Sequence, residues 1–215
     1  MARSRDISKV LSSNTTLATD AEVAASYQTK ATAGLTLLTP TSIANTGGTA
    51  SIGTNGTVSF SSASAISLND VFSATYDFYV IKLGITANTA STDSVINFRL
   101  RVSGSDASTN YITQRIFNTS TTVTGQQDPT GTDRWYWVES SATHPHAYAT
   151  MEVFNPFIAA VTTGTAHTSF RANTGSTYMN LSSFRNTNAT SYTGFSLINS
   201  TGNITGLVSV FGVKK

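Results

Sequence analysis

The carboxylates that could work as a catalytic pair are Asp128 with Asp133, which flank a turn, and Glu139 with Glu152, which lie near neighbouring predicted strands. Two carboxylates on either side of a cleft are the arrangement that glycoside hydrolases use. The chain has 11 Asp and Glu residues in total, and a pair at such a spacing arises among them by chance. We therefore interpret these four as charges on solvated strand edges.

The available bases are the three histidines, and two of them flank Pro145. In an extended segment His144 and His146 point to the same side, so three copies around a three-fold axis would bring six imidazoles together. Six nitrogen ligands suit an octahedral transition-metal site. The interpretation that we prefer is a surface turn in which Pro145 ends a strand. We therefore predict neither a metal site nor a cofactor.

Sequence signatures of catalysis are missing. The chain contains no GxxxxGK[ST] phosphate loop, no GxSxG nucleophile elbow, no HExxH zinc motif and no DxDxDG calcium loop. It has no cysteine, which excludes disulfides, thiol catalysis and cysteine-bound zinc. These features predict a protein that is not an enzyme.

Both tryptophans lie in one short aromatic segment, Arg134-Trp135-Tyr136-Trp137. In a regular strand Trp135 and Trp137 share one face, and Tyr136 shares the other with Val138. If Val138 faces the core, the two indoles project outward and could stack on a sugar or contact another subunit. In the other interpretation, which we prefer, one or both indoles close the core.

The composition is polar but weakly charged. Ser, Thr and Asn together make up 81 of the 215 residues, and charged residues make up 11%, against about 25% in average domains. A net charge of +2 without clustered Lys and Arg argues against a nucleic-acid partner. No apolar run approaches the roughly 18 residues of a membrane helix. We also find no signal-peptide pattern, and expect no membrane insertion.

From about residue 49 onward, apolar and polar residues alternate with period two. Residues 49–53 and 57–62 flank an Asn55-Gly56 turn signal, which predicts a hairpin. We expect about ten strands separated by turn-forming clusters, and they lie at 49–53, 57–62, 77–86, 95–102, 110–118, 134–140, 147–154, 166–172, 177–184, 194–199 and 206–213. This spacing predicts an all-β fold, an antiparallel jelly-roll-like β-sandwich head.

The first 30 residues differ from the rest because they hold seven of the 24 charges. Ser4 and Ile7 suit a short helix, and Thr19 with Glu22 suits a capping box that opens a second one. Each helix is too short to be stable alone, so the segment either docks on another surface or frays. We divide the chain into an N-terminal arm with a linker, 1–48, and a β head, 49–215.

Four segments together resemble virion structural proteins of tailed bacteriophages, especially phages of cyanobacteria and other aquatic bacteria. They are MARSRDISKVLSSNTTLATDAEVAASY, LLTPTSIANTGGTASIGTNGTVSFSSASAISLNDVFSATYDFYVIKL, NFRLRVSGSDASTNY and ITGLVSVFGVKK. The resemblance covers most of the chain in order, through loose patterns rather than catalytic signatures. It implies a protein of the virion, assembled in the bacterial cytoplasm, with a docking arm and a projecting β head.

The resemblance also implies partners: a homo-oligomer, as a trimer, other virion proteins bound through the arm, and a host-surface glycan. The arm residues that it assigns to docking are Arg3, Arg5, Ile7, Val10, Leu11, Val23 and Tyr27. A tail-fibre, tail-tip or baseplate position is the preferred location. Capsid decoration, a head fibre and a freestanding carbohydrate-binding module that uses Trp135 and Trp137 remain alternatives.

Overall fold

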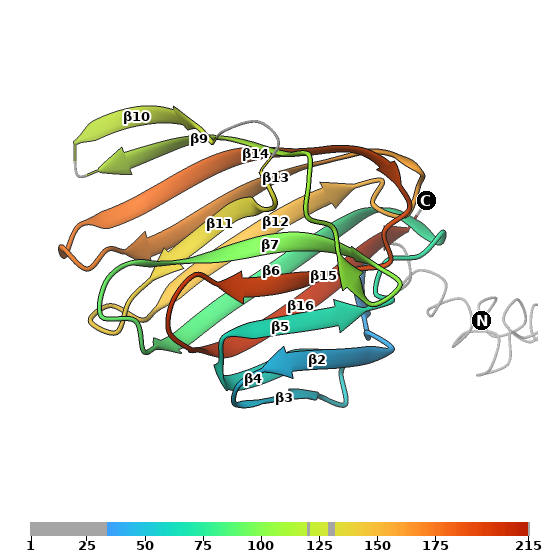
Figure 1. The fold of residues 1–215 in the computed structure, drawn as a ribbon, viewed down its shortest axis with the longest axis horizontal. Coiled ribbons are helices and arrows are strands. Elements are labelled where there is room, and N and C mark those ends of the chain that lie inside the picture. The colour runs from blue at the N-terminus through green and yellow to red at the C-terminus, as the bar shows by residue number, and fades with distance from the viewer. Residues whose placement is uncertain (1–33, 120, 129–131, 215) are drawn as a thin grey trace, which may run out of the picture. The chain divides into compact units, whose positions relative to one another are not determined.

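The chain forms two antiparallel sheets in the computed structural model, which describes residues 34–119, 121–128 and 132–214 (Figure 1). The large sheet has ten strands: in spatial order β10 (Thr122–Gln127), β9 (Tyr111–Thr119), β14 (Thr177–Thr190), β13 (Ala160–Arg171), β12 (Ala147–Phe154), β6 (Tyr76–Asn88), β16 (Ile204–Lys214), β4 (Val58–Ala63) and β3 (Thr49–Ile52), with β1 (Leu35–Leu38) also paired to β16. The small sheet has six: β11 (Trp135–Ser140), β7 (Ser94–Val102), β15 (Gly194–Asn199), β5 (Ala65–Asn69) and β2 (Ser42–Thr46), with β8 (Ser105–Asp106) paired to β7.

None of the described residues is helical, so the predicted all-β class is confirmed for them. The described part of the chain contains no helix with the length and apolarity needed to cross a membrane. The two short helices expected before residue 26 lie outside the described residues.

Alternation of side chains places one face of each strand in the core. On β7, Ile96, Phe98 and Leu100 are buried, while the side chains of Arg99 and Arg101 are partly exposed. The Asn55-Gly56 turn joins β3 to β4 with Ile52 opposite Val58, as its sequence predicts. Alternation works here because successive side chains of a strand point to opposite faces.

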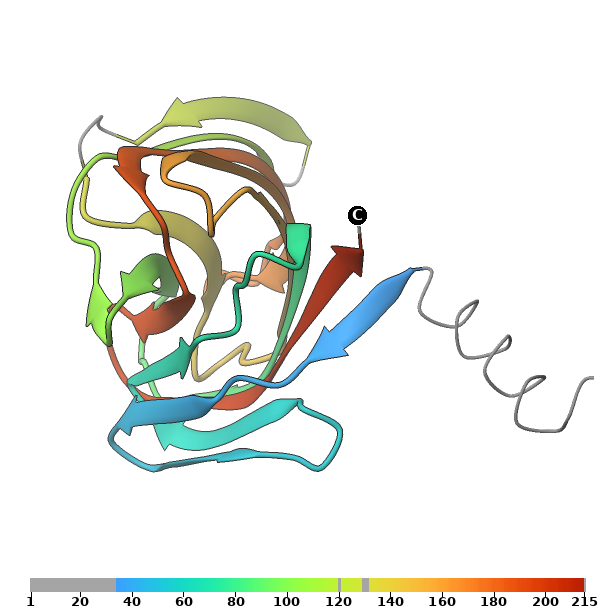
Figure 2. The same ribbon diagram turned by 90° about the vertical axis from the view of Figure 1, so that its right-hand side faces the viewer.

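The inner faces of the two sheets enclose one apolar core, and Figure 2 shows the large sheet curving around the small one. Phe98 lies near the centre, with its ring centroid 4.7 Å from Phe195 and 5.5 Å from Trp135, both stacked. The hydroxyl of Tyr111 accepts a hydrogen bond from the Leu100 amide at 2.8 Å and donates one to the Ala107 carbonyl at 3.1 Å. This pairing satisfies the polar end of a fully buried side chain.

Residues 35–48 are not the linker that we expected. Leu35–Leu38 pairs with the last strand, and Ser42–Thr46 pairs with β5. Both segments are short, the first rich in leucine and the second mostly polar. Their partners are distant in the sequence, so neither alternation nor a local turn marks them. The compact unit therefore begins at Leu35. The structure also adds β5, β8 and β10 to the strands that we expected.

Candidate functional site

One end of the large sheet and the edge strand of the small sheet meet around an arginine. Arg115 belongs to the inward-facing row of β9, and β11 is the edge strand of the small sheet at that end. The guanidinium carbon of Arg115 lies 3.7 Å from the centroid of the Tyr136 ring on β11 and 5.3 Å from that of Phe117. Cation–π attraction therefore holds the charge of Arg115 between the two sheets.

Beside this arginine lies a cavity of about 210 Å³. Its lining combines charged, amide and aromatic side chains: Asp93, Arg115, Phe117, Glu139, Phe170, Ala172, Tyr178 and Asn180. Phe170, Ala172 and Asn180 are buried and form the floor, whereas the other five are partly exposed and form the mouth. The cavity is thus open to solvent.

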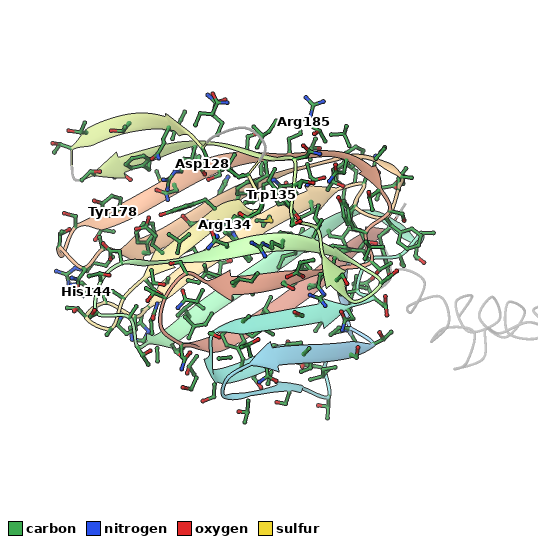
Figure 3. The ribbon with its side chains drawn as sticks, viewed as in Figure 1. Asp128, Arg134, Trp135, His144, Tyr178 and Arg185 are labelled. Atoms are coloured by element: carbon green, nitrogen blue, oxygen red, sulfur yellow. The ribbon has the colours of Figure 1, made fainter. Side chains whose placement is uncertain are left out.

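The aromatic wall of the cavity is ordered by stacking. Tyr178 stacks on Phe170 with centroids 5.2 Å apart and an interplanar angle of 9°, and it also stacks on Phe117 at 6.4 Å. Figure 3 shows Tyr178 near the end of β14 that adjoins the turn to β13. The three rings come from β9, β13 and β14, so the pairing of these strands sets the wall.

Several polar atoms at the cavity have no protein partner. The Oδ1 atom of Asn180 and the Nε atom of Arg115 are buried without a hydrogen bond. The Nη2 atom of Arg115 does donate to Gln126 Oε1 at 2.8 Å, and Asp93 Oδ1 accepts from the Asn173 amide at 2.6 Å. Buried polar groups are normally paired, so the two unpaired atoms require an explanation.

Glu139 contributes a carboxyl group whose titration is displaced. Burial, and to a smaller extent the charge of Asp93, raises its pKa from 4.5 to about 7, while the charge of Arg115 acts in the opposite direction. Burial also lowers the pKa of the Arg115 guanidinium, whereas the charges of Asp128 and Glu139 raise it. The ion pairs among the described residues are Arg99–Asp133, Arg101–Asp106 and Arg134–Asp133, so Glu139 is not neutralised by a direct ion pair.

A second depression, of about 380 Å³, lies on the other side of Tyr136. It is lined by Val95, Asn97, Asp128, Thr132, Arg134, Tyr136 and Ser200. The hydroxyl of Tyr136 is buried there without a hydrogen-bond partner. The two hollows have no lining residue in common, and Arg115 of the first stacks on Tyr136 of the second.

The carboxylates that we considered as catalytic pairs lie in different environments. Glu152 is exposed on the outer face of the large sheet, whereas Glu139 lies at the cavity, so they do not share a cleft. Asp133 is held by Arg99 and by Arg134, the latter at 3.3 Å. Neither arrangement is a carboxylate pair across a cleft.

Trp135 and Trp137 are both fully buried, so the interpretation in which their indoles contact a glycan or another subunit is wrong. Val138 is buried as well, because a β-bulge shifts the pairing of β11 with β7 between Tyr136 and Val138. One extra residue in the strand turns Trp137 and Val138 to the same side. Trp135 Nε1 donates to the Arg185 carbonyl at 3.0 Å, and both residues are labelled in Figure 3.

The His144-Pro145-His146 segment is a turn before β12, as we preferred. The Ser141 amide donates to the His144 carbonyl at 3.4 Å, and the His144 amide donates to the Ser141 hydroxyl at 3.2 Å. His144, labelled in Figure 3, is partly exposed and His146 is exposed. Within the described part of a single chain, no three His, Cys, Asp or Glu residues gather around a point that could hold a metal ion.

The docking residues Arg3, Arg5, Ile7, Val10, Leu11, Val23 and Tyr27 lie outside the described residues. The cavity residues Asp93, Arg115, Tyr178 and Asn180 escaped the sequence analysis, although the strands that carry the last three were expected. An inward-facing Arg115 between Thr113 and Phe117 is the signal that could have revealed the site, because charges seldom face a core.

A third surface feature is an apolar patch on the outer face of the large sheet. Phe78 and Phe154 stand opposite each other on β6 and β12, 52% and 37% exposed, with ring centroids 4.6 Å apart. Leu35 on β1 continues the patch through Val213 on β16, the residue opposite both Phe78 and Leu35. A depression of about 340 Å³ adjoins the two rings.

Comparisons with protein-family models, with curated proteins and with solved structures find no match to this chain.

Proposed function

We propose that this protein is a structural component of a tailed-phage virion, without enzymatic activity. In this proposal residues 1–30 dock the subunit on the particle, and the β head projects from a tail fibre, tail tip or baseplate to contact the host surface. The observation that carries the proposal is where the resembling segments lie in the fold. They supply most of the strands from β1 to β8 and all of β16, so the resemblance extends over both sheets.

The order of the strands supports a jelly roll for the head. Successive segments alternate between the sheets: β4, β6 and β9 lie in the large sheet, while β5, β7 and β11 lie in the small one. This alternation is typical of the paired Greek keys of jelly rolls. In this interpretation the hairpin-linked strands β12, β13 and β14 occupy the place of a single strand.

The apolar patch on the large sheet supports a homo-oligomer, which we propose to be a trimer. Lys82 lies four residues after Phe78 in the outward row of β6, and Glu152 lies two residues before Phe154 in the outward row of β12. A patch that carries both charge signs around apolar rings can meet other copies of itself around a three-fold axis. A strongly acidic or basic partner would suit it less well.

Locating the protein on particles tests the proposal. Antibody labelling of imaged virions, with a count of copies, should place it on the tail in multiples of three. Labelling of the capsid would support the alternative of a decoration protein or head fibre. A protein absent from purified particles would contradict the proposal.

Deletion of residues 2–30 tests the role of the arm. Because the compact unit begins at Leu35, the shortened protein should fold and keep the melting temperature of the full chain. It should not join particles that lack the native protein. Incorporation equal to that of the full chain would show that docking does not depend on these residues.

A further inference from the structure

We infer that the cavity between β9, β11 and β14 binds a single pyranose ring of a neutral saccharide. The inference deepens the host-surface contact of the proposed function by naming a ligand class and residues. It depends on the proposed function only for the source of the sugar.

The size of the cavity limits its occupant. At about 210 Å³, it is smaller than the roughly 300–1,000 Å³ of sites that enclose drug-sized ligands. One six-membered ring with its hydroxyl groups suits this space, with the remaining sugars of a longer chain outside the mouth.

The unpaired polar atoms indicate a ligand that both donates and accepts hydrogen bonds. Asn180 is 1% exposed, and its Oδ1 atom can only accept, whereas the unpaired Nε atom of Arg115 can only donate. A hydroxyl group satisfies either one, and vicinal hydroxyl groups can satisfy both. A group that only donates, or one that only accepts, would leave one of them unpaired.

The charges around the cavity disfavour ionic ligands of either sign. Arg115 attracts anions and repels amines, whereas Asp93 attracts amines and repels anions, so an ion of either sign gains little net attraction at this cavity. Glu139 adds a carboxyl group at the mouth that can accept hydrogen bonds from hydroxyl groups. A neutral polyhydroxyl ligand forms charge-assisted hydrogen bonds with each of these groups and is repelled by none.

The aromatic wall supplies the apolar contact that such a ring needs. Tyr178 and Phe117 are partly exposed at the mouth, and Phe170 supports Tyr178 from below. The carbon–hydrogen face of a pyranose packs against an aromatic ring, while its hydroxyl groups reach the polar side chains. The cavity therefore offers both kinds of contact on adjoining walls.

Calorimetric titration of the full chain tests the inference. The probes are the methyl glycosides of glucose, galactose and mannose, with glucosamine and glucuronate as charged counterparts. We expect saturable binding of at least one neutral glycoside, and at least tenfold weaker binding of the charged sugars. No binding of any neutral glycoside at tens of millimolar, or tighter binding of a charged sugar, would overturn the inference.

Two matched variants separate binding from folding. Asn180→Leu removes the unpaired buried oxygen from the cavity, and Ser182→Ala removes another unpaired buried oxygen from the same row of β14, outside the cavity. We expect Asn180→Leu to weaken binding at least tenfold while its melting temperature stays equal or rises, because an unpaired polar atom is gone. Ser182→Ala should leave the affinity unchanged.

Equal affinity of Asn180→Leu and the native protein would overturn the inference. If Asn180→Leu fails to fold, Tyr178→Leu takes its place, since this side chain is partly exposed at the mouth. It should also weaken binding tenfold or more, and unchanged affinity would contradict the site. These measurements use isolated protein, so a failure to bind sugar would not contradict the proposed location on the particle. In the same way, a different location on the particle would not contradict the sugar site.

Discussion

Replacement of Glu139 by glutamine should change how the stability of the head depends on pH. In the folded protein, burial and Asp93 raise the pKa of this carboxyl from 4.5 to about 7. The folded state therefore holds the proton more tightly than the unfolded state does. The stability from this group is fully present below pH 4.5 and is lost as the pH rises to about 7.

The size of the effect follows from the two pKa values. The interval from 4.5 to about 7, at about 1.36 kcal/mol per pH unit, corresponds to about 3 kcal/mol at most. Because the mouth of the cavity is open to water, screening reduces this to about 1–3 kcal/mol. Glutamine resembles the protonated carboxyl and does not titrate, so the Glu139→Gln variant does not lose this stability as the pH rises.

The assay is urea unfolding of the native protein and the variant at pH 4 and pH 8. The two should have nearly the same free energy of unfolding at pH 4, and the variant should be more stable by about 1–3 kcal/mol at pH 8. Glu152→Gln is the matched control, because it removes a carboxylate from the exposed outer face of β12. An equal stability difference at both pH values, or the same pH-dependent gain in the control, would refute the reasoning.

Three further predictions concern packing and assembly. Gly194→Ala should destabilise the head by 2 kcal/mol or more in urea unfolding, since a Cβ there would lie 2.1 Å from the Leu68 carbonyl oxygen. Gly125→Ala meets nothing within 4 Å and should be neutral or slightly stabilising; similar losses for both would contradict this account. Trp135→Ala should cost about 3–5 kcal/mol, and a loss under 1 kcal/mol would show that the indole is not part of the core. Phe78→Ser with Phe154→Ser should reduce the mass measured by light scattering from trimer to monomer, while Ile116→Ser, at a side chain 54% exposed on the same face, should leave it unchanged. A double variant that stays trimeric would exclude the apolar patch as the subunit contact.

Which parts of this architecture were predictable depended on whether the signal was local. Alternation along residues 95–102 predicts the buried row of β7, and the Asn55-Gly56 turn predicts the β3–β4 hairpin, because both depend on neighbours in the sequence. The pairing of β1 with β16 joins residues at opposite ends of the described chain. No local pattern specifies it.

The bulge in β11 shows the same limit at a single residue. Regular alternation would place both indoles on the face opposite Val138, yet the extra residue between Tyr136 and Val138 brings Trp137 and Val138 into the core together. The register shift depends on how β11 packs beside β7, so it is a property of the sheet rather than of the segment. The preferred interpretation, in which the indoles close the core, was right for a reason that the sequence does not contain.

By itself, the sequence determined the all-β class, most of the strands and, where alternation is regular, which side chains face the core, because these follow from side-chain alternation and turn chemistry. Only the tertiary structure decided which strands are neighbours. Those neighbours bring Asp93, Arg115, Glu139, Tyr178 and Asn180 around one cavity, from segments as far apart as 87 residues. No regular spacing in the sequence marks a site whose residues come from two sheets, because these residues come together only when the sheets pack.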